Sequence, residues 1–168
     1  NGHVLTANMD FATCSRIDAG DDVQLRAVAV DGDVALLKAT STVQPLALPV
    51  FQSIPLQVPA QIVVGGYSYG GLLGAPTITA GQVEDTKDLT GNTDMQRLTA
   101  VVLDGDIGGP VLDRGGAILG ILLPQPVTTV LRPPPVHGLL LLSRPPHRAV
   151  DDSSHAWRHK HCPHVLAQ

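Results

Sequence analysis

The stretch VVLDGDIGGPVLD, residues Val101–Asp113, places a Gly-Asp-x-Gly-Gly-Pro turn between two apolar runs. Such a turn depends on glycine, because glycine accepts backbone angles that other residues resist. Short apolar runs bounded by turn residues are typical of buried strands. The stretch therefore predicts a strand, a tight loop and a second strand, with Ile107 at the centre of the loop.

The composition limits the classes of partner. The chain has 168 residues, of which 15% are charged, and a formal net charge of −4. Its length suits one domain with a sizeable core, or two small barrels that share one. The charge balance argues against a nucleic-acid partner, and no apolar run approaches the length needed to span a bilayer. Two cysteines, Cys14 and Cys162, decide nothing about redox state.

The chemistry of the chain changes near residue 124. Residues 1–123 hold 16 of the 17 glycines and 13 of the 15 acidic residues, with apolar runs between Gly and Asp turns, which is typical of a β-protein. Residues 124–168 hold 8 of the 14 prolines and 6 of the 7 histidines. Proline interrupts both helices and strand ladders, so we expect a mostly irregular or disordered tail there. Only Val136–Ser143 has the composition of a short strand.

Strand-like runs recur in the first part and favour an all-β sandwich or barrel. In DVQLRAVAV, the period of two predicts that Val23, Leu25, Ala27 and Ala29 share one face. Met9–Thr13 is expected to form one helical turn, and Asp113–Gly116 a hairpin turn. The expected strands are His3–Ala7, Ser15–Asp18, Val23–Val30, Val34–Ala39, Ile62–Gly66, Thr77–Glu84, Met95–Leu103, Pro110–Leu112 and Ala117–Leu123.

A first hydrolase signal is Gly66-Tyr67-Ser68-Tyr69-Gly70, which matches the G-x-S-x-G nucleophile elbow. An elbow needs a helix directly after the serine to hold it on a strained turn. The following residues, GLLGAPTITAGQV, instead predict a loop and then a strand. We therefore expect a glycine-rich loop with an exposed Ser68 that is not a nucleophile.

A second signal comes from several stretches in order. HVLTANMDFATC, GDVALLKA and LDGDIGGPVLD resemble the three active-site segments of the chymotrypsin-like (trypsin-fold) serine peptidases, which read V-L-T-x-x-H, D-x-A-L-L and G-D/N-S-G-G-P. VVGGYSYGGLLGAPTITAGQV is similar to a loop and strand of the family's bacterial members, including the HtrA-type proteases. The resemblance covers about residues 2–123. It implies a two-barrel trypsin-like fold, N-terminally truncated, as a partial peptidase domain over 1–123, and a periplasmic or secreted location.

The resemblance also implies a role for particular residues. In the family a histidine takes the proton of a serine, an aspartate orients the histidine, and backbone N–H groups stabilise the oxyanion. Asp33 matches the orienting aspartate, whereas Met9 stands at the histidine position and Ile107 at the serine position. Gly105 and Ile107 match the oxyanion hole. We expect Met9, Asp33 and Ile107 to converge at a cleft between two barrels.

Three polar side chains near these positions were weighed as substitutes for the missing groups. They are His3, Asp10 and Ser68, and each is expected to be a polar surface residue rather than a replacement for the base or the nucleophile. A chain with neither group is expected to have lost the family's usual mechanism.

The remaining expectations concern ligands. The family pattern places Leu98, Thr99, Ala117 and Ile118 around the specificity pocket, which suggests an apolar pocket for a peptide or protein segment. No cofactor is expected. The tail holds His155, His159, His161, Cys162 and His164, but their spacing matches no closed four-ligand zinc motif. We interpret them as a histidine-rich end that binds metal only adventitiously, and expect no metal site.

Three functions remain open at this point. The favoured one is a non-catalytic peptidase homologue that binds a peptide or protein. The second is an active serine endopeptidase whose sequence is altered at positions 9 and 107. The third is a β-barrel binding module with no protease ancestry.

Overall fold

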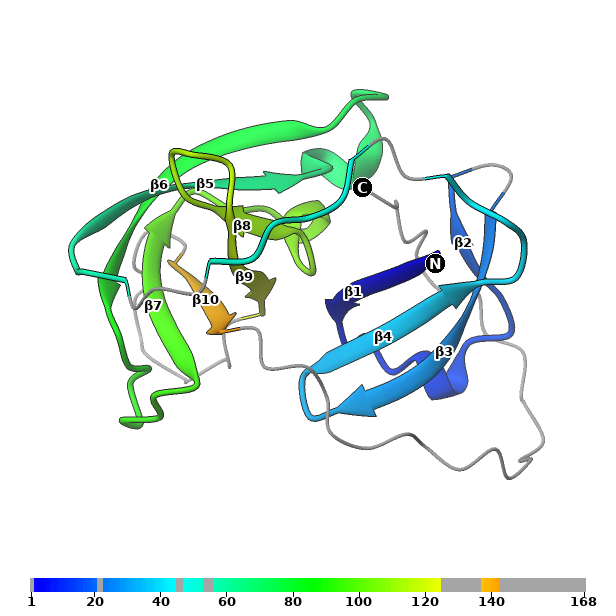
Figure 1. The fold of residues 1–168 in the computed structure, drawn as a ribbon, viewed down its shortest axis with the longest axis horizontal. Coiled ribbons are helices and arrows are strands. Elements are labelled where there is room, and N and C mark those ends of the chain that lie inside the picture. The colour runs from blue at the N-terminus through cyan, green and yellow to red at the C-terminus, as the bar shows by residue number, and fades with distance from the viewer. Residues whose placement is uncertain (1, 21–22, 45–46, 53–55, 125–136, 143–168) are drawn as a thin grey trace. The chain divides into compact units, whose positions relative to one another are not determined.

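The computed structural model describes residues 2–20, 23–44, 47–52, 56–124 and 137–142. The described residues fall into two compact units, unit 1 up to Leu48 and unit 2 from Pro49 onward (Figure 1). Both are built from antiparallel strands, with 3-10 turns as their only helical elements in the described part of the chain. The predicted all-β, two-barrel trypsin-like class is confirmed, and it takes the form of two curled sheets. No helix among the described residues is long and apolar enough to cross a membrane.

Unit 1 is a four-stranded sheet in the order β1-β4-β3-β2. One face packs on a cluster that includes Phe11, Leu25 and Leu37. Phe11 lies in the 3-10 turn η1 (Phe11–Thr13), inside the segment predicted to form one helical turn. The strands are β1 (His3–Ala7), β2 (Ile17–Ala19), β3 (Val23–Asp31) and β4 (Val34–Ala39).

The predicted alternation along β3 is wrong at one position. Leu25 and Ala29 are buried and Val23 is half-buried, but Ala27 is exposed. The register between β3 and β4 shifts between Ala27 and Ala29, which marks a β-bulge with Val28 as the extra residue. A bulge interrupts the period of two, and hydrophobicity alone does not locate it.

Unit 2 is a closed barrel of six strands in the order β10-β7-β6-β5-β8-β9. Alternate residues of β7, namely Gln96, Leu98 and Ala100, are buried, while the residues between them are half-buried. Leu98 is fully buried in the core cluster with Val64 and Val111. The strands are β5 (Ala60–Gly66), β6 (Thr77–Asp85), β7 (Met95–Ala100), β8 (Pro110–Leu112), β9 (Ile118–Leu123) and β10 (His137–Leu142).

The barrel closes through the tail. Strand β10 pairs with β7 on one side and with β9 on the other, so the strand predicted at Val136–Ser143 is confirmed. The rest of the tail, including the histidine-rich group from His155 to His164, lies outside the described residues, and the predicted irregular tail stays a prediction.

At the β8–β9 turn, Asp113 accepts the backbone N–H groups of Gly115 and Ala117 on one carboxylate oxygen. The predicted hairpin turn is therefore confirmed.

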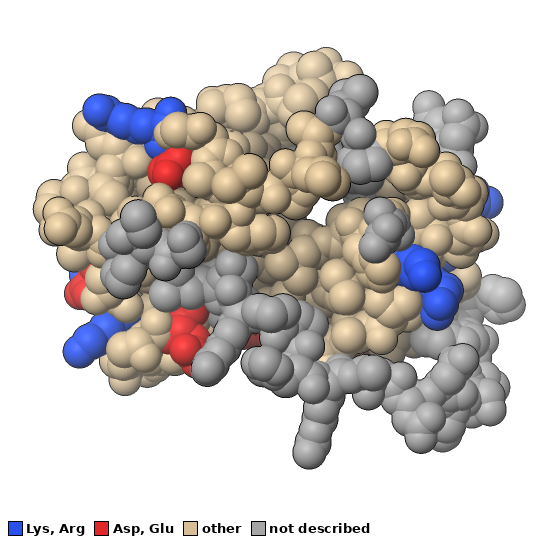
Figure 2. Space-filling view, in the orientation of Figure 1, with Lys and Arg blue, Asp and Glu red and all other residues tan. Residues whose placement is uncertain are grey.

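A long part of the chain carries no charge. Between Lys38 and Glu84 there is no Lys, Arg, Asp or Glu. Figure 2 shows a few separate charged groups on this face of the molecule, with wide uncharged areas between them. Four apolar side chains of this stretch lie at the connection between β5 and β6 and are more than half exposed: Tyr69, Leu72, Leu73 and Ile78. We call these four residues the apolar loop patch.

The tightly packed core of the barrel predicts that a cavity made there lowers the stability of the protein. Leu98→Ala removes a side chain with 0% exposure, so we expect a loss of about 2–5 kcal/mol in the free energy of unfolding, measured by urea denaturation. Ile78→Ala is the matched control, because Ile78 is 66% exposed and should change stability by less than about 0.5 kcal/mol. Equal losses in the two variants would contradict the described barrel interior.

Candidate functional site

The two unit 1 positions, Met9 and Asp33, are brought together by the residue before Met9. Asn8 donates its backbone N–H to the carbonyl oxygen of Asp33 over 2.7 Å, and its side-chain amide donates to the carbonyl oxygen of Gly32 over 3.0 Å. Its side-chain oxygen also accepts the backbone N–H of Asp10 over 3.1 Å. The loop after β1 is thus fixed to the β3–β4 turn, and the roles predicted for Met9 and Asp33 stay predictions.

The environments of Met9 and Asp33 differ. Met9 is half-buried and packs against the apolar cluster of unit 1, as its thioether side chain favours. Asp33 is exposed to solvent, so its charge needs no histidine partner to offset burial. His3 and Asp10 are exposed as predicted. The side chain of Met9 therefore covers part of the unit 1 core, and its match to the family's histidine position stays a prediction.

In unit 2, the Gly-Asp-x-Gly-Gly-Pro stretch forms the 3-10 turn η3 (Asp104–Asp106) followed by an extended residue, Ile107. Ile107 is half-buried. Its backbone N–H donates to the carbonyl oxygen of Asp104 over 3.4 Å, a long hydrogen bond within the loop. One of the two N–H groups that match the oxyanion hole therefore points at a carbonyl of its own loop. The convergence of Ile107 with Met9 and Asp33 joins the two units and stays a prediction.

Beneath this loop lies a buried carboxylate that the sequence reasoning missed. Asp106 is 1% exposed. One of its oxygens accepts the hydroxyl of Ser68 over 2.7 Å, and the other accepts the backbone N–H of Leu103 over 2.9 Å. Ser68 and Thr77 are also in contact, with 2.7 Å between their hydroxyl oxygens. Three oxygen-bearing side chains from three segments thus meet in the interior of unit 2.

The prediction that Ser68 is an exposed residue is wrong. Ser68 is 5% exposed and begins η2 (Ser68–Gly71), a 3-10 turn interrupted by positive φ angles at Tyr69 and Gly70. A loop then leads into β6, so the helix that a nucleophile elbow needs is absent from this described segment. Ser68 was expected on the surface because glycine-rich loops normally lie there. The hydrogen bond to Asp106, 38 residues away, explains its burial.

Two glycines allow the loops to approach one another. A Cβ on Gly66 would lie 2.4 Å from a carboxylate oxygen of Asp106. A Cβ on Gly105 would lie 2.0 Å from the carbonyl oxygen of Tyr67, whose own N–H donates to the carbonyl oxygen of Gly105 over 3.0 Å. Both distances are far below a van der Waals contact, so any side chain at either position would force the loops apart.

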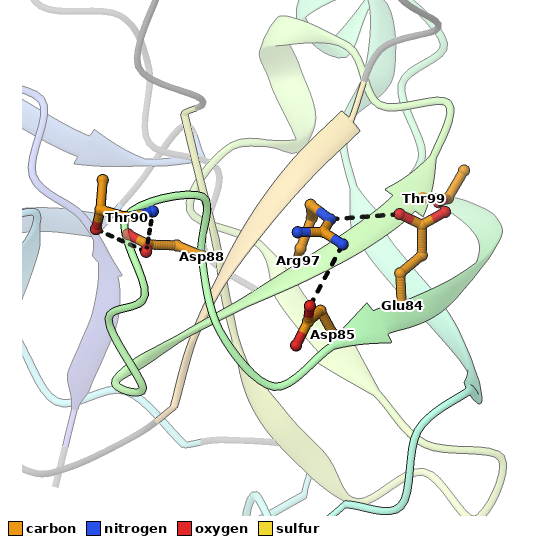
Figure 3. Close-up of polar contacts among 6 residues, drawn as sticks. All are labelled: Glu84, Asp85, Asp88, Thr90, Arg97 and Thr99. Atoms are coloured by element: carbon orange, nitrogen blue, oxygen red, sulfur yellow. Dashed lines mark hydrogen bonds and ion pairs between the residues drawn. The ribbon is translucent and has the colours of Figure 1, made fainter.

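The four predicted pocket residues are not brought together in one lining. Leu98 is buried in the barrel core. The hydroxyl of Thr99 instead donates a hydrogen bond to Glu84, and Glu84 also forms an ion pair with Arg97 (Figure 3). Thr99 lines an open surface cavity of about 530 Å³ together with Gln82, Glu84 and Arg114. Successive residues of a strand point to opposite faces, so the side chains of Leu98 and Thr99 lie on opposite faces of β7.

The other two predicted pocket residues lie at the β8–β9 hairpin. Ala117 and Ile118 are half-buried there. Ile118 forms a parallel bridge with Phe51, at the start of unit 2. Ile118 thus pairs with the chain of its own unit, and the specificity pocket stays a prediction.

Figure 3 also shows the hydrogen bonds of Asp88 with Thr90. The hydroxyl of Thr90, helped by backbone N–H groups, lowers the pKa of Asp88 below its usual value, although Asp88 belongs to a β6–β7 loop away from the GDIGGP stretch. No group of three or more His, Cys, Asp or Glu in the described part of the chain is arranged to hold a metal ion.

The family follows from a comparison with family models. The model described as a trypsin-like peptidase domain matches residues 1–121. This chain belongs to that family. The match rules out the alternative of a β-barrel binding module unrelated to proteases. A comparison with curated proteins gave no significant match.

Solved structures similar to this peptidase domain are proteases. The Rv3671c protease in its inactive form, from M. tuberculosis, is 26% identical, with a TM-score of 0.62 over 84% of this chain and 74% of that chain. The MamO protease domain from Magnetospirillum magneticum is 23% identical, with a TM-score of 0.64 over 84% of this chain and 79% of that one. A serine endoprotease from Yersinia pestis is 20% identical, with a TM-score of 0.65 over 84% of this chain but only 49% of that one. The last two likenesses show the fold alone.

The close approach of Gly105 to Tyr67 can be tested by a substitution at Gly105. We expect Gly105→Ala to lower the free energy of unfolding by about 1–3 kcal/mol, because its Cβ meets backbone that has to shift. Gly115→Ala is the matched control: the nearest atom to its Cβ, a carboxylate oxygen of Asp113, lies 3.3 Å away. Both variants are compared by urea denaturation. A Gly105→Ala protein as stable as the control would show that the Tyr67 contact is not part of the fold.

Proposed function

We propose that this trypsin-like peptidase domain is a non-catalytic homologue that binds an extended peptide or protein segment without cleaving it. The observation that carries the proposal is the pair of residues at the family's base and nucleophile positions, Met9 and Ile107. A thioether does not accept a proton at neutral pH, and an isoleucine side chain has no nucleophilic atom. An enzyme without its triad keeps about 10³–10⁴-fold acceleration over water, which is too little for a useful protease.

Among the described residues, the three side chains named above as possible substitutes are poorly placed for the missing roles. His3 and Asp10 lie on the surface of unit 1. Ser68 is buried, and its only hydroxyl proton is given to the carboxylate of Asp106. A serine engaged in this way inside the protein cannot reach a peptide bond, so it is a poor candidate for the nucleophile.

The surface supports a binding role. The apolar loop patch presents Leu72 at 87% exposure and Tyr69 at 62%, within a stretch of the chain that has no charged residue. Exposed apolar patches on soluble proteins often mark interaction sites, because their burial against a partner is favourable. An apolar peptide or protein segment suits this surface better than a charged one, which would lose hydration without finding an opposite charge.

Binding without cleavage is directly testable. On an array of immobilised peptides, we expect the chain to retain apolar peptides, while mass spectrometry of the same peptides in solution shows no cleavage and a serine-directed phosphonate probe leaves the protein unlabelled. Leu72→Ser with Leu73→Ser should lower the binding at least tenfold, about 1.4 kcal/mol. Leu89→Ser is the matched control, because Leu89 is 71% exposed but lies outside the uncharged stretch.

Three outcomes would contradict this proposal. Cleaved peptides would mean that the chain is an enzyme despite positions 9 and 107. A phosphonate adduct on Ser68 would identify that residue as a nucleophile. Retention that is equal in the control and the double serine variant would remove the apolar loop patch from the binding surface.

The rival, an endopeptidase altered at two positions, makes a different prediction. Met9→His and Ile107→Ser together should raise peptide hydrolysis by about 10²–10⁴-fold, because a serine then has a base to take its proton. Each single change should do almost nothing, since a base and a nucleophile act only as a unit. Hydrolysis of a fluorogenic peptide by the four proteins measures this. Equal rates in the single and double variants would mean that positions 9 and 107 do not belong to one site.

A further inference from the structure

The strongest unexplained feature is the buried oxygen cluster of Ser68, Thr77 and Asp106. Its members come from η2, from the first residue of β6 and from η3, so it joins three segments that are separate along the chain. Ser68 and Asp106 are 5% and 1% exposed. The proposed function uses none of these three side chains, and burial of polar groups costs free energy unless each is hydrogen-bonded.

The protons in this cluster can be counted. A serine or threonine hydroxyl has one proton to donate and an ionised carboxylate has none. Ser68 therefore donates to Asp106 over 2.7 Å, and the 2.7 Å contact between the two hydroxyl oxygens is filled by the proton of Thr77. The alternative acceptor for Thr77, the carbonyl oxygen of Gly66, lies farther away at 3.1 Å. The resulting relay runs from Thr77 through Ser68 to Asp106, and each hydrogen bond polarises the next.

The carboxylate orients the loop above it. Its second oxygen accepts the N–H of Leu103 over 2.9 Å, while the backbone N–H of Asp106 donates to the carbonyl oxygen of Leu103 over 2.8 Å. These two hydrogen bonds close residues 103–106 into a ring. The closed ring leads directly into the hydrogen bond between the N–H of Ile107 and the carbonyl oxygen of Asp104. The direction of the residue 107 N–H is thus set by where the carboxylate of Asp106 is held.

Among the described residues, the side chain that bonds to this carboxylate is the hydroxyl of Ser68 and not a cation. The ion pairs of the described residues are Arg16 with Asp18, and Arg97 with Glu84 and Asp85, and none of them involves Asp106. The segment that faces the carboxylate, from β5 to β6, is part of the uncharged stretch between Lys38 and Glu84. A charge-assisted hydrogen bond from a hydroxyl is stronger than one between neutral groups, so Ser68 is the main partner for one of the two oxygens.

We infer that Ser68 is a positioning residue, which fixes residues 103–107 through the carboxylate of Asp106, with Thr77 as the second member of the relay. The inference goes beyond the proposed function and does not depend on whether the chain cuts peptides. It assigns the G-x-S-x-G stretch a role that is neither nucleophilic nor incidental. Removal of the Ser68 hydroxyl releases the carboxylate, and the ring of residues 103–106 opens.

Amide hydrogen exchange measured by NMR on the full chain tests this role. In Ser68→Ala we expect exchange at the Leu103 and Ile107 amides to speed up about tenfold, the size of effect that the loss of one hydrogen bond gives. The amides of the β5–β6 ladder should keep their rates. A residue with a merely structural role would instead speed exchange throughout unit 2, so the selectivity for two amides is the deciding readout.

A second, milder variant keeps the test decisive where Ser68→Ala does not fold. Thr77→Val removes only the outer donor of the relay, and Thr79→Val, on the same strand and also half-buried, is its matched control. Selective acceleration at Leu103 and Ile107 in Thr77→Val but not in Thr79→Val supports the inference. Unchanged exchange in both, or uniform acceleration across the barrel, overturns it.

Discussion

The burial of one carboxyl group governs the local structure of unit 2. The carboxylate of Asp106 is almost completely removed from water, and its two oxygens are satisfied by a hydroxyl and a backbone N–H. Each of these donors must come within hydrogen-bond distance, so the loop after β5 has to fold down against the loop before β8. Gly66 has no side chain because the carboxylate occupies that space. A burial penalty of several kcal/mol for an unpaired charge is enough to impose this arrangement.

The same constraint explains why the loop keeps its form with isoleucine at its centre. The shape of residues 103–107 is set by hydrogen bonds to Asp106 and by the contact of Gly105 with Tyr67, all of which are independent of the side chain at position 107. Ile107 adopts an ordinary extended conformation and is half-buried. The backbone shape of the loop therefore does not depend on which side chain stands at position 107.

The fold was largely predictable, because apolar runs and turn residues alternate regularly. The bounds predicted for β1, β4 and β8 agree with the structure, and the others differ by a few residues at their ends. The β-bulge between Ala27 and Ala29 was not predictable, since a bulge leaves no mark in the hydrophobic pattern. The loop that carries Met9 lies beside the β3–β4 turn that carries Asp33 because the backbone N–H of Asn8 bonds to Asp33, whereas the roles assigned to the two residues stay predictions.

The buried site of unit 2 was missed because its partners are distant in sequence. Ser68 and Asp106 are 38 residues apart, and a serine in a glycine-rich loop normally indicates exposure. The only signal in the sequence was indirect. Ser68 and Thr77 flank a loop without charged residues, and Asp106 follows an apolar run elsewhere in the chain. Long-range polar pairs of this kind become visible only when the strands have been placed.

The closure of the barrel by β10 affects how the protein folds during its synthesis on the ribosome. Strands β7 and β9 each rely on β10 for one row of hydrogen bonds, and β10 ends at Leu142. During synthesis, the nascent second barrel therefore has two open edges until residue 142 has left the exit tunnel, whereas the described strands of unit 1 end by Ala39. Open edges invite pairing with other chains. The second barrel thus passes through an aggregation-prone interval that ends when β10 pairs, whereas the described sheet of unit 1 keeps β1 and β2 as edge strands.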